Sequence, residues 1–259
     1  MALTFRRRRV QEPDGTMTVV EHLDELRRRL FISLSAIFLC GFVAWFLYNP
    51  VYRFLTNPYC AFMVRHPDLA QNPARPCDLV YLSIPEPFLV KIKTVGALAL
   101  VLALPVVLFQ LWRFITPGLT SRERRFAIPF VIASLVLFAM GAVFALWTLP
   151  KALSFLLGFA GTTRVASVLT MGKYLSFVTL VILAFGASFE FPVVLVSLTM
   201  VGVVSSRQLR EWRRWALLGI AVFAAVITPS QDWFTMTAMM VPLLVFYELS
   251  ILIARLLKK

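Results

Sequence analysis

The stretch FGASFEFPVVL, residues 185–195, places a carboxylate, Glu190, in the middle of apolar sequence. No other charged residue occurs from Tyr174 to Ser206, and this run exceeds the about 20 residues that cross roughly 30 Å of hydrocarbon. An ionised carboxylate at mid-bilayer costs about 2.5–3.5 kcal/mol on insertion scales, so intramembrane acids are rare and functional by default. The stretch therefore predicts a membrane-spanning helix that carries a polar site.

The remainder of the chain has the same membrane character. Of its 259 residues, 59% are hydrophobic and 15% are charged, whereas a soluble domain averages about a quarter charged. A soluble protein with an unusually apolar core is excluded because several runs approach the length of a membrane span. We expect an all-α polytopic membrane protein with six transmembrane helices, at 31–48, 94–112, 126–149, within 174–206, at 215–228 and at 233–254. The fifth is short, at about 21 Å of helix, which predicts local thinning of the bilayer.

The distribution of Lys and Arg predicts how these spans are oriented. Of the 26 basic residues, 18 lie on the side that holds both termini and 8 lie on the opposite side. Because basic residues concentrate in cytoplasmic loops, both termini are expected in the cytoplasm. The chain is interpreted as one domain, in which residues 1–30 form a cytoplasmic segment with an amphipathic helix, 31–254 the six-span bundle and 255–259 a cytoplasmic tail.

The N-terminus, MALTFRRRRV, is basic but is not typical of a cleavable signal peptide. Residues 11–29 are polar, and the first apolar run, from Phe31, lacks a small-residue cleavage site, so it is expected to remain as an anchor. The formal net charge of +13 is expected to attract anionic lipid headgroups. Nucleic acid is not expected as a partner because the sequence contains no nucleic-acid-binding motif.

The first outside connection, residues 49–93, holds seven of the fifteen prolines, which predicts that no continuous helix runs through it. Cys60 and Cys77 both lie in this connection, in an oxidising compartment if the orientation is as predicted. We expect them to form a disulfide, which in the chain-entropy account contributes about 3 kcal/mol. Cys40 lies in the first span and is interpreted as a small apolar residue.

Two carboxylates stand out on the basic cytoplasmic side. Residues 18–21 fit a capping box, and the helix that follows carries Glu25 and Arg29 at i,i+4 spacing. The plain alternative is an amphipathic helix lying at the membrane surface with a solvated charged face. Glu123 is the only acid among four arginines, at 113, 122, 124 and 125, and its plain alternative is an incidental acid in a basic loop.

Inside the membrane, Glu190 is expected to be hydrogen-bonded, neutral or facing a wet cavity. Pro192 cannot donate a backbone hydrogen bond, so a kink is expected, and Gly186 and Ser188 permit close approach of another helix. The alternative is a structural kink with the carboxyl group satisfied inside its own bundle. Thr228 opens the last outside turn and is able to bond its own backbone.

The remaining polar residues predict no catalytic centre. Glu248, near the inner end of the last span, is expected to pair with Arg255, seven residues further on. His22 and His66 lie on opposite sides of the membrane, and no metal-ligand cluster occurs. The sequence contains no phosphate-binding glycine-rich loop and no evident Ser/His/Asp arrangement. We therefore expect no cofactor and no enzymatic activity.

Four motifs together resemble the TatC family, the core subunits of the twin-arginine protein translocase. They are HLDELRRRL at 22–30, FQLWRFITPGL at 109–119 with SRERR at 121–125, FGASFEFP at 185–192, and ITP at 227–229. The resemblance implies a concave six-helix bundle with short fifth and sixth spans in a bacterial-type inner membrane. It also implies binding of folded precursors through a signal peptide with two adjacent arginines. Export would then proceed with TatA and TatB in a multimeric complex, driven by the proton-motive force.

The resemblance also implies roles for individual residues. Glu25 and Glu123 match the family's contacts with the signal peptide, and guanidinium groups favour carboxylates in bidentate geometry. Trp112 and Phe114 match the aromatic part of the same site. Glu190 matches the family's intramembrane acid, which would offer a hydrogen bond to a polar group of a partner helix or of the signal peptide.

Thr228 matches a polar position that the family associates with docking TatA or TatB. The turn that it opens reads TPSQD here, where the family usually has a sequence like TPPD. Thr235 and Met236 stand in the region where a glutamine is common. These departures concern docking of partner helices rather than binding of the signal peptide.

Two other functions stay open on the sequence. A proton-coupled small-molecule transporter would use Glu190 as its proton carrier, and it needs a second membrane acid or base near the midplane, which the sequence does not clearly show. A structural protein would organise single-span helices without contacting cargo through its cytoplasmic glutamates.

Overall fold

The computed structural model describes residues 19–66, 74–75, 77–115, 127–158, 169–228 and 232–256. These residues form helices joined by short connections, and their one β-type contact is an isolated bridge between Val80 and Thr170. The helices are α1 (Val19–Arg65), α2 (Glu86–Ile115), α3 (Ala127–Gly158), α4 (Met171–Phe189), α5 (Phe191–Met200), α6 (Ser206–Glu211), α7 (Arg213–Ile227) and α8 (Trp233–Leu256).

The predicted all-α membrane architecture is confirmed. Five segments are long and apolar enough to cross a bilayer: Leu23–Arg65, Glu86–Phe114, Ile128–Leu156, Met171–Met200 and Trp233–Leu256. The sixth span is α7, whose 15 residues rise only about 22 Å. The last span, α8, has 24 residues, the fewest of these five segments, and keeps Pro242 inside a continuous helix.

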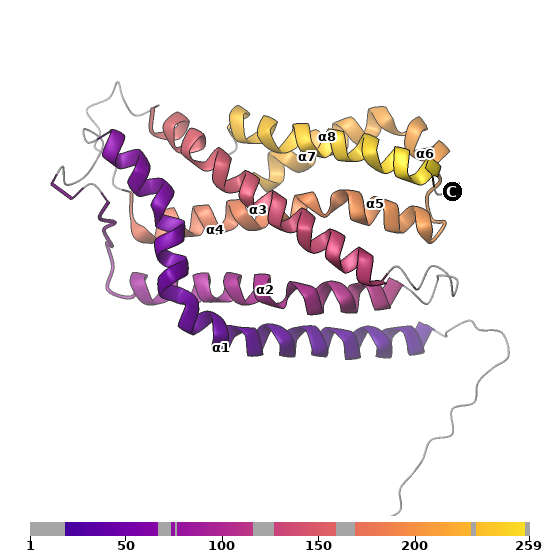
Figure 1. The fold of residues 1–259 in the computed structure, drawn as a ribbon, viewed down its shortest axis with the longest axis horizontal. Coiled ribbons are helices and arrows are strands. Elements are labelled where there is room, and N and C mark those ends of the chain that lie inside the picture. Colours follow the sequence, from indigo (N-terminus) through magenta and orange to yellow (C-terminus); the bar gives the residue numbers. More distant parts are fainter. Residues whose placement is uncertain are drawn as a thin grey trace, which may run out of the picture.

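The first helix differs most from the prediction. It runs without interruption for 47 residues and contains Pro50 and Pro58, so the expected helix end near residue 49 is wrong. A proline removes one backbone hydrogen bond and commonly bends a helix instead of ending it, and α1 is visibly bent (Figure 1). Packing stabilises the extension, since Leu55 and Tyr59 lie in a buried cluster with Tyr174, whose hydroxyl donates to the Leu55 carbonyl at 2.9 Å.

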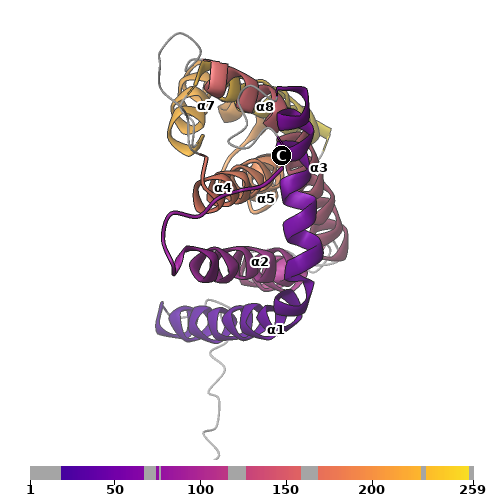
Figure 2. The same ribbon diagram turned by 90° about the vertical axis from the view of Figure 1, so that its left-hand side faces the viewer.

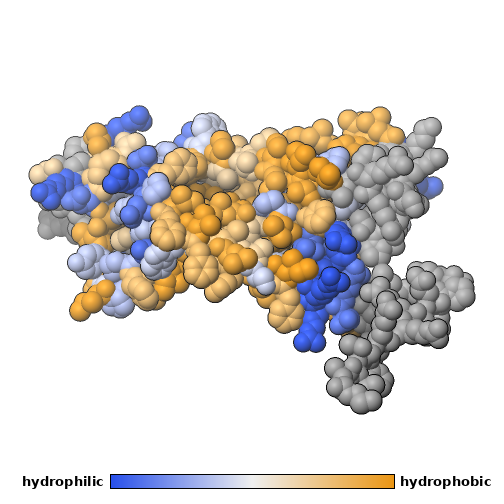
Figure 3. Space-filling model, turned by 60° about the horizontal axis from the view of Figure 1, so that its bottom comes forward, coloured by the Kyte–Doolittle hydropathy of each residue, from blue (hydrophilic) through white to orange (hydrophobic). Residues whose placement is uncertain are grey.

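The other end of α1 also continues into the span. Its segment 19–30 leads directly into the apolar residues from Phe31 onward, so a separate helix lying at the membrane surface is not what forms. Figure 3 shows that the face built from α1 and α2 carries a broad hydrophobic band between hydrophilic ends. Apolar side chains exposed on such a band, among them Phe38 and Phe46, are typical of contact with lipid.

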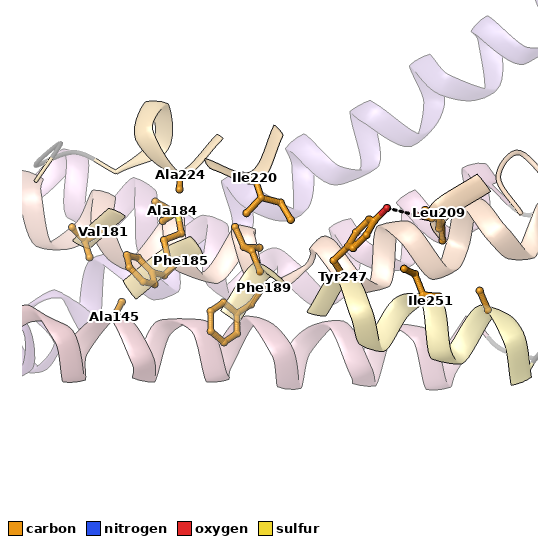
Figure 4. Close-up of a cluster of buried hydrophobic side chains, with 13 residues drawn as sticks. Ala145, Val181, Ala184, Phe185, Phe189, Leu209, Ile220, Ala224, Tyr247 and Ile251 are labelled. Carbon is orange, nitrogen blue, oxygen red and sulfur yellow. Dashed lines mark hydrogen bonds between the residues drawn. The ribbon is translucent and has the colours of Figure 1, made fainter. Parts of the chain in front are cut away.

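The helices form a row in which α1 and α2 make one edge and α7 and α8 the other, with α4 and α5 between them (Figures 1 and 2). The largest buried cluster joins α4 to α7 and α8 through side chains that include Phe185, Phe189 and Tyr247 (Figure 4), and α5 packs against it. The Tyr247 hydroxyl donates to the carbonyl of Leu209 at 2.5 Å, which ties α8 to α6.

The crossing of α3 over α4 depends on two glycines. A Cβ atom at Gly141 would lie 2.6 Å from the carbonyl oxygen of Phe185, and one at Gly186 would lie 2.5 Å from the ring of Phe138. At Gly141 the obstructing atoms belong to the backbone of Phe185 and Gly186, so the two backbones approach this closely only because Gly141 lacks a side chain, whereas Gly186 makes room for the ring of Phe138. The prediction that Gly186 permits a close helix approach is therefore confirmed.

The C-terminal part of α1 and the first turns of α2 and α4 are tied together by polar contacts. A disulfide joins Cys60 of α1 to Cys77, and their Cα atoms are 4.5 Å apart. The carboxylate of Glu86, at the start of α2, accepts backbone N–H groups from Leu82 at 2.9 Å and from Gly172 at 2.8 Å. These contacts hold the connection between α1 and α2 against the first turn of α4.

Candidate functional site

The N-terminal part of α1 carries a paired but incompletely satisfied carboxylate. Glu25 Oε1 accepts from the guanidinium of Arg29, one helical turn along, and Arg29 also donates to the carbonyl oxygen of Gln110 in α2 at 3.3 Å. The side chains of Glu25 and Arg29 are 22% and 12% exposed. Glu25 Oε2 is buried and has no hydrogen-bond partner within the described part of the chain. One carboxylate oxygen is thus held in place while the other is available as an acceptor.

The aromatic residues predicted for this site lie at the C-terminal end of α2. Trp112 is fully buried, and its ring centroid is 4.2 Å from that of Phe130 in α3. Its indole N–H finds no acceptor among the described residues. Phe114 is half-buried near the end of the same helix. Glu123 lies outside the described residues, so the structure does not place it relative to Glu25.

The intramembrane acid sits at a break in the fourth span. Glu190 separates α4 from α5, and its backbone N–H bonds to the carbonyl of Ala187 at 3.1 Å instead of continuing the α-helical pattern. Pro192 follows in the first turn of α5, as the predicted kink requires. The Glu190 side chain is half-buried and faces Ser134 of α3.

The contact between Glu190 and Ser134 leaves the hydrogen-bonding capacity of both side chains incompletely satisfied. The serine hydroxyl lies beside the carboxyl group without meeting the geometry of a full hydrogen bond. Glu190 Oε1 and Ser134 Oγ are both buried and lack hydrogen-bond partners in the described ranges. Ser134 is a residue that sequence reasoning missed, although a hydroxyl among the apolar residues of the third span was a usable signal. The pair is a polar site that a group from another helix could complete.

Thr228 caps the end of α7 and lies in a different environment from Glu190. Its hydroxyl donates to the carbonyl of Ala224 at 2.6 Å, as expected from the sequence, and the residue is buried. It lines a groove of about 520 Å³ between α4 and α7, together with Ser188 and mainly apolar side chains. Glu190 is not among the lining residues, so the structure does not bring the two predicted docking residues into one pocket.

Two further carboxylates have contacts that the sequence did not indicate. Glu248 pairs with Arg213 of α7 at 2.6 Å, so the expected pairing with Arg255 is wrong. The reason is that a residue of a neighbouring helix comes closer than the one two turns along the same helix. Asp232 accepts the backbone N–H of Thr235 at 2.8 Å and so caps the start of α8. No group of three potential metal ligands lies together in the described residues.

Comparison with known proteins matches this arrangement to one family. Residues 21–242 match the family described as "Sec-independent protein translocase protein (TatC)". The protein of that name from Frankia casuarinae is 44% identical over 97% of this chain and 69% of its own length. The one from Aquifex aeolicus is 38% identical over 93% of this chain and 95% of its own. A crystal structure titled twin arginine translocase receptor TatC gives a TM-score of 0.74 at 37% identity, covering 92% of this chain and 100% of that one. The chain therefore belongs to the TatC family of Sec-independent protein translocase proteins.

Proposed function

We propose that this chain is the core receptor subunit of a twin-arginine translocase. It binds the twin-arginine signal peptides of folded precursor proteins and, with TatA and TatB, mediates their export by the proton-motive force. The observation that carries the proposal is the Glu25 carboxylate, which lies in the family's first motif and keeps one oxygen without a partner among the described residues.

The contacts of Glu25 suit the recognition of a guanidinium group. Arg29 occupies Oε1 and is itself fixed to α2 through the Gln110 carbonyl, so the carboxylate is oriented before a ligand arrives. Oε2 then accepts an N–H of one signal-peptide arginine in a charge-assisted hydrogen bond. Glu123 is proposed as the acceptor for the second arginine, with Trp112 and Phe114 shaping the wall of the site.

Charge explains why isolated acids matter at this surface. The chain has 26 Lys and Arg residues against 13 Asp and Glu residues, and most of the basic ones lie on the proposed cytoplasmic side. Such a face repels a pair of arginines unless a carboxylate supplies local complementarity. Selectivity for arginine over lysine follows from the planar, multi-donor guanidinium group, which an ammonium group does not reproduce.

The membrane-embedded polar groups are proposed to dock partner helices. Glu190 with Ser134 forms one contact point, and Thr228 on the groove between α4 and α7 forms another. A hydrogen bond in hydrocarbon contributes about 0.6–2 kcal/mol, which biases docking without fixing it. The proposed setting is a bacterial inner membrane with both termini in the cytoplasm, and self-association in a multimeric complex.

Site-specific crosslinking tests the proposal. A photoreactive side chain at position 25 or 123 is expected to capture a twin-arginine precursor and to capture a twin-lysine version poorly. Glu25→Gln removes the charge but keeps the shape, and it should lower capture about tenfold, since a hydrogen bond to a charged group contributes about 1.5–3 kcal/mol. Asp24→Asn is the matched control, because Asp24 is an exposed neighbouring acid on the same helix. Equal capture by Glu25→Gln and by the unaltered chain would remove the site assignment.

The transporter alternative is less well supported by the contacts of Glu190. The side chain found to interact with its carboxyl group is the Ser134 hydroxyl, and no second acid or base is found beside it among the described residues. Proton-coupled uptake of a small molecule by the purified chain alone in liposomes would favour that alternative.

A further inference from the structure

A second groove lies between α2 and α4, toward the outer ends of both helices. It encloses about 460 Å³ and adjoins the groove beside Thr228 through Leu180 and Leu183, which line both. Its walls come from two helix stripes, Val90, Lys93, Thr94, Gly96, Ala97 and Leu100 on α2, and Leu175, Ser176, Thr179, Leu180 and Leu183 on α4.

The polar side chains of this groove lie in the half nearer the helix starts, next to the apolar Val90 and Leu175. Lys93 and Thr94 of α2 lie opposite Ser176 and Thr179 of α4, near the outer ends of the two helices. Every lining residue deeper in the membrane than these four is apolar. A groove with this gradient matches a molecule that has one charged end and one hydrocarbon end.

The length of the groove matches one leaflet of a bilayer. Its α2 side runs from Val90 to Leu100, and ten residues of helix rise about 15 Å. The hydrocarbon core of a bilayer is about 30 Å thick, so the groove reaches from the outer surface to about the midplane. A membrane-spanning helix, by contrast, would continue through both leaflets.

The charged end is not neutralised by the protein itself. Lys93 is exposed and forms no ion pair with any described residue. Lys91, two residues earlier, faces the other way and lies 4.0 Å from the ring centroid of Trp45. The hydroxyl of Thr179 is buried and has no hydrogen-bond partner in the described part of the chain. The groove therefore presents one free cation and one unused hydroxyl group.

We propose that this groove binds one anionic phospholipid of the outer leaflet. The lipid phosphate lies against Lys93, an ester oxygen accepts from Thr179, and one acyl chain fills the apolar part between α2 and α4. This inference goes beyond the proposed function. The assignment to the outer leaflet rests on the orientation given under the proposed function. Lipid binding itself is measured without any precursor protein.

Removing the charge tests the lipid selectivity. The purified chain is mixed with phosphatidylglycerol or phosphatidylcholine, and the retained lipid is counted by native mass spectrometry. The unaltered chain should retain phosphatidylglycerol in preference. Lys93→Gln should reduce that retention about fivefold, as expected for one lysine at a membrane surface. Lys151→Gln is the control, because Lys151 lies at the outer end of α3 and packs on Trp147, 3.8 Å from its ring centroid.

Filling the groove tests its location. A Cβ atom at Gly96 would meet no described atom within 4 Å, so Gly96→Leu places a side chain in the groove without a clash at its base. It should reduce retention of both lipids, whereas Gly219→Leu, at an equally unobstructed position on α7, should not. Thermal unfolding shows whether each variant is folded. If Gly96→Leu does not fold, the lipid retention of Lys93→Gln tests the proposal by itself.

Two results would overturn the proposal. One is that the unaltered chain retains phosphatidylglycerol and phosphatidylcholine equally and that Lys93→Gln changes neither retention. The other is a photoreactive side chain at position 96 that captures a protein helix and no lipid in membranes. Neither result bears on crosslinking from position 25, so failure of this inference is distinguishable from failure of the proposed receptor function.

Discussion

The carboxylate of Glu86 accepts hydrogen bonds from two segments that lie far apart in the sequence. Its two oxygens are shared between Leu82, just before α2, and Gly172, in the first turn of α4. Backbone N–H groups at a helix start lack partners inside the helix, and a carboxylate there is also favoured by the helix dipole. A single side chain thus fixes how the outer ends of α2 and α4 meet.

We predict that a substitution of either partner, Glu86 or Gly172, destabilises the protein. Glu86→Ala removes the acceptor, and Gly172→Ala adds a Cβ atom only 2.6 Å from Glu86 Oε1, which displaces the carboxylate. Both variants should lower the midpoint of thermal unfolding in detergent. Glu211→Ala is the control, because that glutamate is exposed and pairs with Arg207 of its own helix. A midpoint unchanged in both test variants would contradict the role given to Glu86.

At the scale of elements, helix contacts in this chain rely on close backbone approach as much as on apolar side chains. Gly141 and Gly186 let α3 cross α4 closely. Gly186 lies four residues before Glu190, where α4 ends. In hydrocarbon there is little hydrophobic force between helices, so packing and small residues carry the association.

The α3–α4 crossing predicts an unusual response to alanine. Alanine is favoured over glycine in a helix by about 1 kcal/mol, so Gly219→Ala should be neutral or stabilising. Gly141→Ala should instead lower stability by about 1–3 kcal/mol, because its Cβ atom meets the backbone of Phe185 and Gly186. Unfolding measured by helix content against denaturant compares the two. An equal effect of both substitutions would show that the crossing is not so tight.

The outer extension of α1 gives a second prediction at this scale. Cys60 and Cys77 should resist labelling by a thiol reagent until a reductant is added, whereas Cys40 is the free cysteine of the chain. Reduction should lower stability by about 3 kcal/mol in the chain-entropy account. Cys40→Ala provides the control chain, in which labelling without reductant should vanish. Labelling of Cys60 or Cys77 before reduction would contradict the disulfide.

At the scale of the whole molecule, the fold places its chemically distinct sites at different depths. The paired carboxylate of Glu25 lies at one end of the bundle, the Glu190–Ser134 contact within the span, and the disulfide and Glu86 contacts at the opposite end. The short α7 packs against α8 at one edge of the row, so bilayer thinning is expected on that edge.

The six-span topology predicts which positions are accessible from each side. Ile84 is 94% exposed before α2, and Ile84→Cys should react with a membrane-impermeant thiol reagent in intact cells. Arg210, exposed on α6, lies on the opposite side, so Arg210→Cys should react only after the membrane is opened. The reverse labelling pattern would invert the proposed orientation, and labelling of both in intact cells would contradict the span count.

Most of the fold was predictable from the sequence because hydropathy and charge are local properties. Apolar runs predicted the spans, the distribution of basic residues predicted an orientation, and the isolated acids at positions 25 and 190 marked candidate sites. The course of α1 through Pro50 and Pro58 was not predictable, because a local rule about proline was outweighed by packing against Tyr174.

The sequence alone thus determined the class of the protein, its number of membrane crossings and which acids stand out. Only the tertiary structure decided the contacts between helices: the Gln110 carbonyl for Arg29, Ser134 beside Glu190, and Arg213 for Glu248. The physical reason is that periodicity places a side chain on a face of its helix but not opposite a particular residue. That depends on how closely and at what angle neighbouring helices cross, which glycines such as Gly141 set through contacts with distant backbone.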